Sequence, residues 1–115
     1  MLTLDALRAY GANVDEGLAR CMNDESFYLK IVGMVQADGN FDRLKNGMAV
    51  RDTREVFEAA HALKGSTGNV ALTPIYTPLA RLSDMLKGRT DAVMGPECDQ
   101  LASEALAQFE RLKAL

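Results

Sequence analysis

The only histidine of the chain, His61, lies beside a lysine and two glycines in the sequence HALKGSTGN, residues 61–69. On a helix, residues three, four and seven positions apart share one face, so Lys64, Gly65 and Gly68 would lie on the same side as His61. An imidazole can act as a nucleophile that forms a covalent intermediate in group transfer. A cation one turn away suits an incoming phosphoryl group, because phosphoryl transfer depends mostly on positioning and charge neutralisation.

The residues around His61 are poor choices for a helix that serves structure alone. Each interior glycine costs about 0.8–1 kcal/mol relative to alanine, and Ser66, Thr67 and Asn69 compete with the helix for backbone hydrogen bonds. Residues that disfavour a helix, placed within a helical pattern without an evident structural gain, point towards function. We expect the glycines to let the backbone of a partner protein approach the imidazole. Phe57, four residues before His61, would either pack on its ring or help to form an apolar docking patch.

Other interpretations of this stretch fit the residues less well. A lone helical histidine is commonly a half-buried structural residue, but the lysine and glycines beside it weaken that interpretation. KGSTGN could be a glycine-capped helix end, although the apolar pattern continues through it. The order Lys-Gly differs from that of a phosphate-binding loop, whose motif is GxxxxGK followed by Ser or Thr. One histidine without a ligand cluster predicts no metal site and no resident cofactor.

Helical periodicity dominates the rest of the chain, and no alternating pattern predicts a strand. Asp24 and either Asp52 or Thr53 are candidate N-caps, and Pro96 is placed to open the last helix. The expected helices cover approximately residues 14–21, 24–38, 40–49, 53–70, 74–86 and 96–112. Pro78 would kink the helix at 74–86 or mark its true start.

These elements predict an all-α protein with one domain over residues 1–115. Apolar residues at i, i+4, i+7, i+11 and i+14 form a seam for packing, namely Val56, Ala60, Leu63, Thr67 and Val70. The helix at 24–38 is apolar almost all round, so we expect it to be central. The most economical architecture is an antiparallel up-and-down four-helix bundle with short additional N-terminal helices.

Composition excludes several classes of partner. The net charge is −3 and the pI about 5.1, which argues against a nucleic-acid surface, because such surfaces are basic. The longest apolar run, residues 29–35, is too short to span a membrane. No signal peptide is visible at the N-terminus, and Cys21 and Cys98 fit buried, unpaired positions. We therefore expect a cytoplasmic protein; the sequence does not determine its oligomeric state, and a monomer is the default expectation.

The HALKGSTGN stretch resembles the signature of histidine-containing phosphotransfer (HPt) domains, which is His-x-x-Lys-Gly followed by small residues. The resemblance covers nearly the whole chain, because residues 14–32 look like the N-terminal helices of that family. It implies a four-helix bundle without an ATP site of its own. One departure is Ala71, since the family commonly has a glycine ten residues after the histidine.

The resemblance also implies a role for each residue of the motif. His61 would accept a phosphoryl group from the aspartyl phosphate of a response-regulator receiver domain and pass it to another receiver. Lys64 would stabilise the phosphoryl group, and Gly65 would give the partner access. Ser66, Thr67, Gly68 and Asn69 occupy the small and polar positions that follow. Mg²⁺ would come with the receiver, and a hybrid histidine kinase is a further expected partner.

Two other functions remain open at this point. The chain could be a helical module that binds receivers without transfer. It could also be the phosphorylated domain of a larger kinase of the chemotaxis or hybrid type, with ATP bound on a separate domain. The sequence names neither the cognate receivers nor the imidazole nitrogen that would be phosphorylated.

Overall fold

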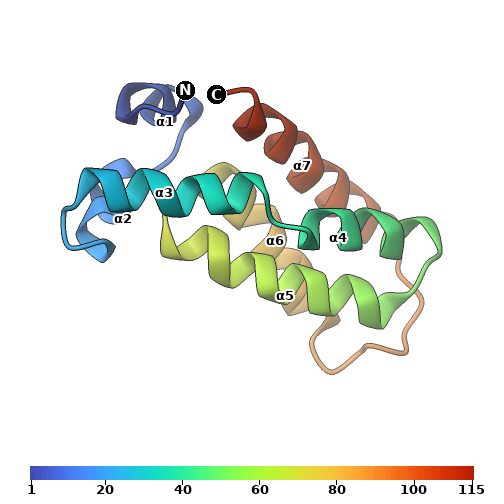
Figure 1. Cartoon of the computed structure of the whole chain (residues 1–115). Helices are drawn as coiled ribbons and strands as arrows, with labels where there is room; N and C mark the ends of the chain where they lie inside the picture. The colour runs from blue at the N-terminus through green and yellow to red at the C-terminus, as the bar shows by residue number, and fades with distance from the viewer.

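Seven helices and no strand make up the chain, and the computed structural model describes all residues from 1 to 115 (Figure 1). The helices are α1 (Leu4–Tyr10), α2 (Val14–Arg20), α3 (Glu25–Gln36), α4 (Asn40–Ala49), α5 (Thr53–Asn69), α6 (Thr73–Leu86) and α7 (Pro96–Lys113). The all-α prediction is therefore confirmed. The segment from Lys87 to Gly95 forms no helix, as expected of the loop before the last helix.

Capping residues fix the helix starts where the sequence predicts them. The Asp24 side chain accepts a hydrogen bond from the Phe27 amide at 3.1 Å and begins α3. The Asp52 side chain does the same for α5, with the Glu55 amide at 3.2 Å. These bonds satisfy amides that have no partner within the helix. Pro78 lies inside α6, so it does not mark the helix start.

Four helices pack around one core. α5 contacts α4 on one side and α6 on the other, and α7 contacts both α6 and α4 (Figure 1). The interior holds fully buried aliphatic residues from all four helices, including Leu44, Leu63, Leu82 and Leu112. Phe41 of α4 stacks on Phe109 of α7, with ring centroids 3.6 Å apart. A helical bundle is thus present, and the antiparallel up-and-down order of its helices stays a prediction.

α3 does not occupy the central position that we expected for it. Only Tyr28, Val32 and Val35 of α3 are buried, which is a single stripe at i, i+4 and i+7. Phe27 and Met34 are 44% and 60% exposed. The expectation was wrong because an all-round apolar sequence does not show whether partners exist on every side.

The N-terminal segment supplies hydrogen-bond donors at the C-terminal end of α5. The Arg20 guanidinium donates to the Gly68 carbonyl at 2.7 Å, and the Tyr28 hydroxyl donates to the Val70 carbonyl at 3.0 Å. The amide of Asn13 donates to the carbonyl of Ala71 at 3.0 Å. The last carbonyls of a helix have no partner within it, so three groups from residues 13–28 supply the missing donors.

We expect Tyr28→Phe to lower the free energy of unfolding by about 1–3 kcal/mol, because the buried Val70 carbonyl loses its donor. Burial also raises the pKa of Tyr28 to about 12. A tyrosine in the unfolded chain ionises near pH 10, so its contribution is present below pH 10 and is lost as the pH rises towards 12. Urea unfolding at pH 7 and across pH 9.5–11.5 checks both effects. Equal stability of the two proteins at pH 7 would contradict the assignment.

The structure also describes the cysteines and the helix lengths. Cys21 and Cys98 are both buried and both free, as the sequence predicts. None of the seven helices combines the length and the apolar character that crossing a bilayer requires.

Candidate functional site

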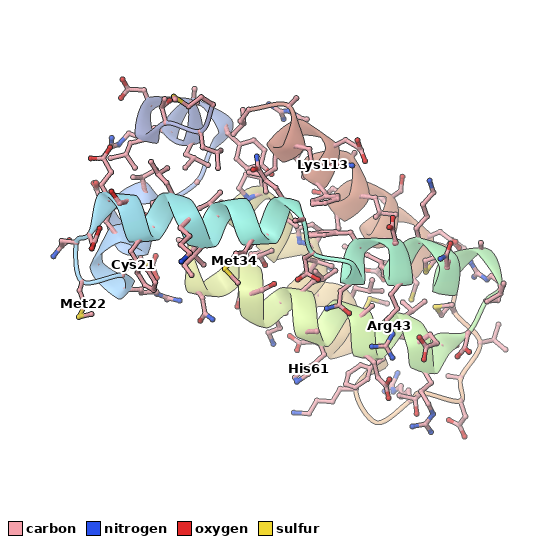
Figure 2. The ribbon with its side chains drawn as sticks, viewed as in Figure 1. Cys21, Met22, Met34, Arg43, His61 and Lys113 are labelled. Atoms are coloured by element: carbon pink, nitrogen blue, oxygen red, sulfur yellow. The ribbon has the colours of Figure 1, made fainter.

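α5 carries His61 midway along its length, on the side that faces solvent. The helix continues without interruption from Thr53 to Asn69, through both Gly65 and Gly68. The buried seam predicted for this segment is confirmed, since Val56, Ala60, Leu63 and Thr67 within α5 and Val70 at its C-cap are all buried. His61, one residue on from Ala60, is exposed and projects from α5 away from the other helices (Figure 2). The bundle therefore presents the imidazole to a partner.

The His61 ring has one close aromatic neighbour. Phe57, one turn earlier, lies with its ring centroid 5.7 Å from that of His61 and with the two planes 19° apart. Phe57 is half-buried, so packing on the imidazole is the interpretation that the structure favours. The imidazole makes no hydrogen bond within the chain, and the residue is exposed to solvent.

Lys64 is tethered to a neighbouring helix. Its Nζ lies 3.4 Å from Oδ1 of Asp84, which belongs to α6. The lysine side chain is 32% exposed and the aspartate side chain 70% exposed. Exposed pairs of this kind contribute little to stability, at most about 1 kcal/mol. Lys64 therefore lies one turn from His61 and is held in place only weakly.

An arginine of α4 binds two carboxylates on the other side of His61. Nε of Arg43 lies 2.6 Å from Glu55, and Nη2 also bonds Glu58, which is one turn before His61. The hydrogen bond from Arg43 holds the pKa of Glu55 below its usual value, and the two carboxylates raise the pKa of Arg43. One arginine thus pairs with both acidic side chains that precede His61 on α5.

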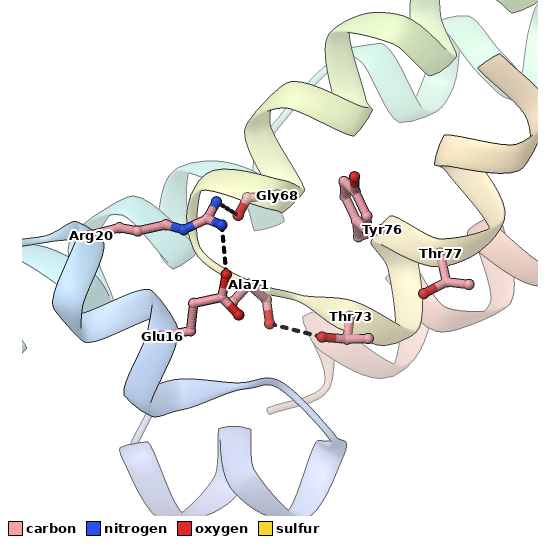
Figure 3. A pocket seen from close by; sticks show the side chains of 7 residues that line it. All are labelled: Glu16, Arg20, Gly68, Ala71, Thr73, Tyr76 and Thr77. Carbon is pink, nitrogen blue, oxygen red and sulfur yellow. Dashed lines mark hydrogen bonds and ion pairs between the residues drawn. The ribbon is translucent and has the colours of Figure 1, made fainter. Parts of the chain in front are cut away.

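The two glycines of the motif have different surroundings. A Cβ atom added at Gly65 would meet nothing within 4 Å, so the position next to His61 is open. A Cβ atom added at Gly68 would lie 3.0 Å from Cε1 of Tyr76 in α6. Gly68 therefore packs against Tyr76, with which it lines a pocket (Figure 3), and its part in partner access stays a prediction.

The remaining residues of the motif serve the helix or border a groove. Ser66 and Thr67 both donate to the Leu63 carbonyl, at 3.2 and 2.7 Å. Thr67 is fully buried, so it supports the site from within and cannot contact a partner. Asn69 is exposed and, with Ser66, borders a groove beside Met34 of α3.

Ala71 adopts the backbone conformation that glycine favours. Its φ is +54°, in the left-handed region. The Leu72 amide donates to the Thr67 carbonyl and the Ala71 amide to the Gly68 carbonyl, which is the pattern of a Schellman cap. The departure from the family pattern thus falls at the turn after α5, away from His61.

Sequence reasoning missed Arg43 and Asp84. Both reach the face of α5 that carries His61 from neighbouring helices, Arg43 through Glu58 and Asp84 through Lys64. No signal in the sequence identifies them, because a pair such as Lys64 and Asp84 depends on the packing of α5 against α6. No three histidine, cysteine, aspartate or glutamate side chains gather closely enough to hold a metal ion.

Comparison with known proteins adds a family to this geometry. A family model described as Hpt domain matches residues 34–114, a range that includes α4, α5, α6, α7 and the whole motif around His61. No curated protein and no solved structure matches the chain. The chain belongs to the Hpt domain family, whose members are phosphocarrier modules for histidine phosphotransfer in two-component phosphorelays.

Proposed function

We propose that His61 is the phospho-accepting residue and that the chain relays a phosphoryl group between receiver domains. The observation that carries the proposal is that a member of a histidine phosphotransfer family has a single histidine. That histidine is exposed, has no hydrogen bond within the chain and lies midway along a bundle helix.

The proposed chemistry is a direct displacement at phosphorus. An unprotonated ring nitrogen of His61 forms the bond to phosphorus as the bond between phosphorus and the receiver's aspartyl oxygen breaks. The aspartate leaves as a carboxylate, and the same step in reverse phosphorylates a second receiver. Mg²⁺ belongs to the receiver. Lys64 offsets the charge of the phosphoryl group, which is the main contribution that this chain can make to such a step.

Gly65 and Arg43 support this step in different ways. The open position at Gly65 lets the rim of a receiver's active site come close to the imidazole. Arg43 pairs with Glu58, which weakens the repulsion between that carboxylate and a phosphoryl group one turn away. Both contributions are proposals that follow from the placement of these residues.

The identity of the phosphoryl donor distinguishes this proposal from the main alternative function. In the rival function, a kinase catalytic domain phosphorylates His61 directly from ATP, as in the phosphorylated domain of a larger kinase. We favour receivers as donors because the HxxKG motif around His61 resembles that of domains that exchange phosphoryl groups with receivers. A helical module that only binds receivers would have no use for an exposed imidazole with a cation one turn away.

The experiment compares donors under one set of conditions. The protein is mixed with Mg²⁺ and either a panel of phosphorylated receivers or a kinase catalytic domain with ATP, and an unphosphorylated second receiver is then added. We expect label to pass from at least one receiver to this chain and on to a second. Label arriving only from the kinase domain would favour the rival function. Complex formation without transfer of label would favour the module that binds receivers without transfer.

A further inference from the structure

Asp84 occupies a position for which helix structure gives no reason. It lies in the last turn of α6, where the helix dipole disfavours an acidic residue, and aspartate is also a poor helix former. Its side chain is 70% exposed and has one partner, Nζ of Lys64 at 3.4 Å. An exposed pair is too weak to explain an acidic residue there on grounds of stability. What Asp84 does accomplish is to contact the ammonium group of Lys64, the residue one turn from His61.

Lys64 can reach either of two partners. It is three residues from His61, a spacing that makes the two side chains neighbours on the helix surface. Its stem is long and flexible, and its ammonium group carries three donors. While His61 is unmodified, Asp84 is the only anion that Lys64 contacts. A phosphoryl group on the imidazole would add a second anion with more charge than one carboxylate.

The two charged neighbours of His61 on α5 are held with different strength. Glu58 shares with Glu55 an arginine that makes three hydrogen bonds to the pair. Lys64 has one long contact to one exposed carboxylate. The carboxylate of Glu58 is thus held by an arginine, whereas the ammonium group of Lys64 has one long contact and can be released.

We propose that Asp84 is a positioning residue that holds Lys64 on the α6 side of the site and competes with the phosphoryl group for it. The inference rests on the proposed function in one respect, because it takes His61 as the nucleophile. Asp84 then sets how readily His61 accepts a phosphoryl group. Removing the carboxylate releases Lys64 and favours the phosphorylated state.

The test uses phosphoramidate as a small donor, so that no receiver is needed. A ring nitrogen of His61 bonds to phosphorus, the phosphorus–nitrogen bond of phosphoramidate breaks and ammonia leaves, while the proton on the other ring nitrogen goes to solvent. The rate is followed by ³¹P NMR or intact mass. We expect Asp84→Asn to accelerate labelling about two- to fivefold, the range that an exposed ion pair allows. Asp84→Glu should restore the wild-type rate.

A double-mutant cycle separates action through Lys64 from simple charge repulsion. In a Lys64→Met background, Asp84→Asn should leave the labelling rate unchanged. Glu97→Gln is the matched control, because it removes one negative charge from an exposed pair between α6 and α7, with Arg81 at 3.1 Å. Equal acceleration in the Lys64→Met background or by Glu97→Gln would overturn the proposal, as would an unchanged rate for Asp84→Asn alone.

The stability of the Asp84→Asn variant would change if Asp84 had a structural role. Asp84→Asn should unfold at the same urea concentration as the wild type or at a higher one, since it removes an acidic residue from a helix end. A clear loss of stability would assign Asp84 a structural role and overturn the inference. The experiment is also separable from the relay. If phosphoramidate labels His61 but no receiver does, the proposed function fails and the role of Asp84 stands.

Discussion

Gly65→Ala is expected to stabilise the protein and to slow its exchange of phosphoryl groups with receivers. The new methyl group meets nothing within 4 Å, so no strain opposes the gain in helix propensity. That gain is about 0.8–1 kcal/mol, which corresponds to a rise of about 4 °C in Tm. The same methyl group stands one turn from His61, where the partner must approach closely. Because small misplacements of reacting groups cost up to about 10² in rate, we expect a loss of at least about tenfold.

Gly33→Ala is the matched control for this variant. Gly33 lies inside α3, and a Cβ atom added there also meets nothing within 4 Å. It should raise Tm by a similar amount and leave transfer unchanged. Thermal unfolding by circular dichroism and the rate of transfer from a phosphorylated receiver measure the two effects. A Gly65→Ala protein that exchanges at the wild-type rate would show that the open position has no part in docking.

Lys64→Met is expected to slow transfer about tenfold without weakening the fold. Removing one electrostatic donor from a water-excluded site costs about 10²–10³ in rate. Lys64 is about a third exposed, so we expect a smaller loss. Methionine keeps the apolar length of the side chain, and the lost surface pair should change stability by less than about 0.5 kcal/mol.

Single-turnover kinetics separate chemistry from docking for this variant. The rate at saturating receiver should fall, while the receiver concentration that gives half the maximal rate should change little. An unchanged maximal rate with weaker binding would instead assign Lys64 to the docking surface. The fold can be checked by urea unfolding in the same buffer.

Much of the helical pattern could be predicted because helices leave local signals. Asp24 and Asp52 cap their helices through bonds to amides three residues away, and both partners are visible in sequence. The partners of a helix are not local. The spacing of Tyr28, Val32 and Val35 predicts a buried stripe on α3. Nothing in the sequence of α3 indicates that α4 packs against α7 in the bundle.

The same contrast between local and non-local signals decides which residues around His61 could be predicted. The neighbours of His61 on its own helix follow from spacing, so Phe57 and Lys64 could be placed beside it. Arg43 and Asp84 reach the site from α4 and α6. No sequence pattern links them to residues of α5 that lie so far away along the chain. The ring beside Gly68 could not be placed for the same reason, because it belongs to Tyr76 of the next helix.

The central claim is that His61 carries the phosphoryl group, and one labelling measurement tests it most directly. Wild-type protein and His61→Gln are incubated with a phosphorylated receiver and Mg²⁺, and the label on this chain is tested for loss in acid and persistence in base. We predict acid-labile, base-stable label on the wild type and none on His61→Gln, with both proteins equally folded. Label of the same stability on His61→Gln, or no label on the wild type from any receiver that binds it, would contradict the claim.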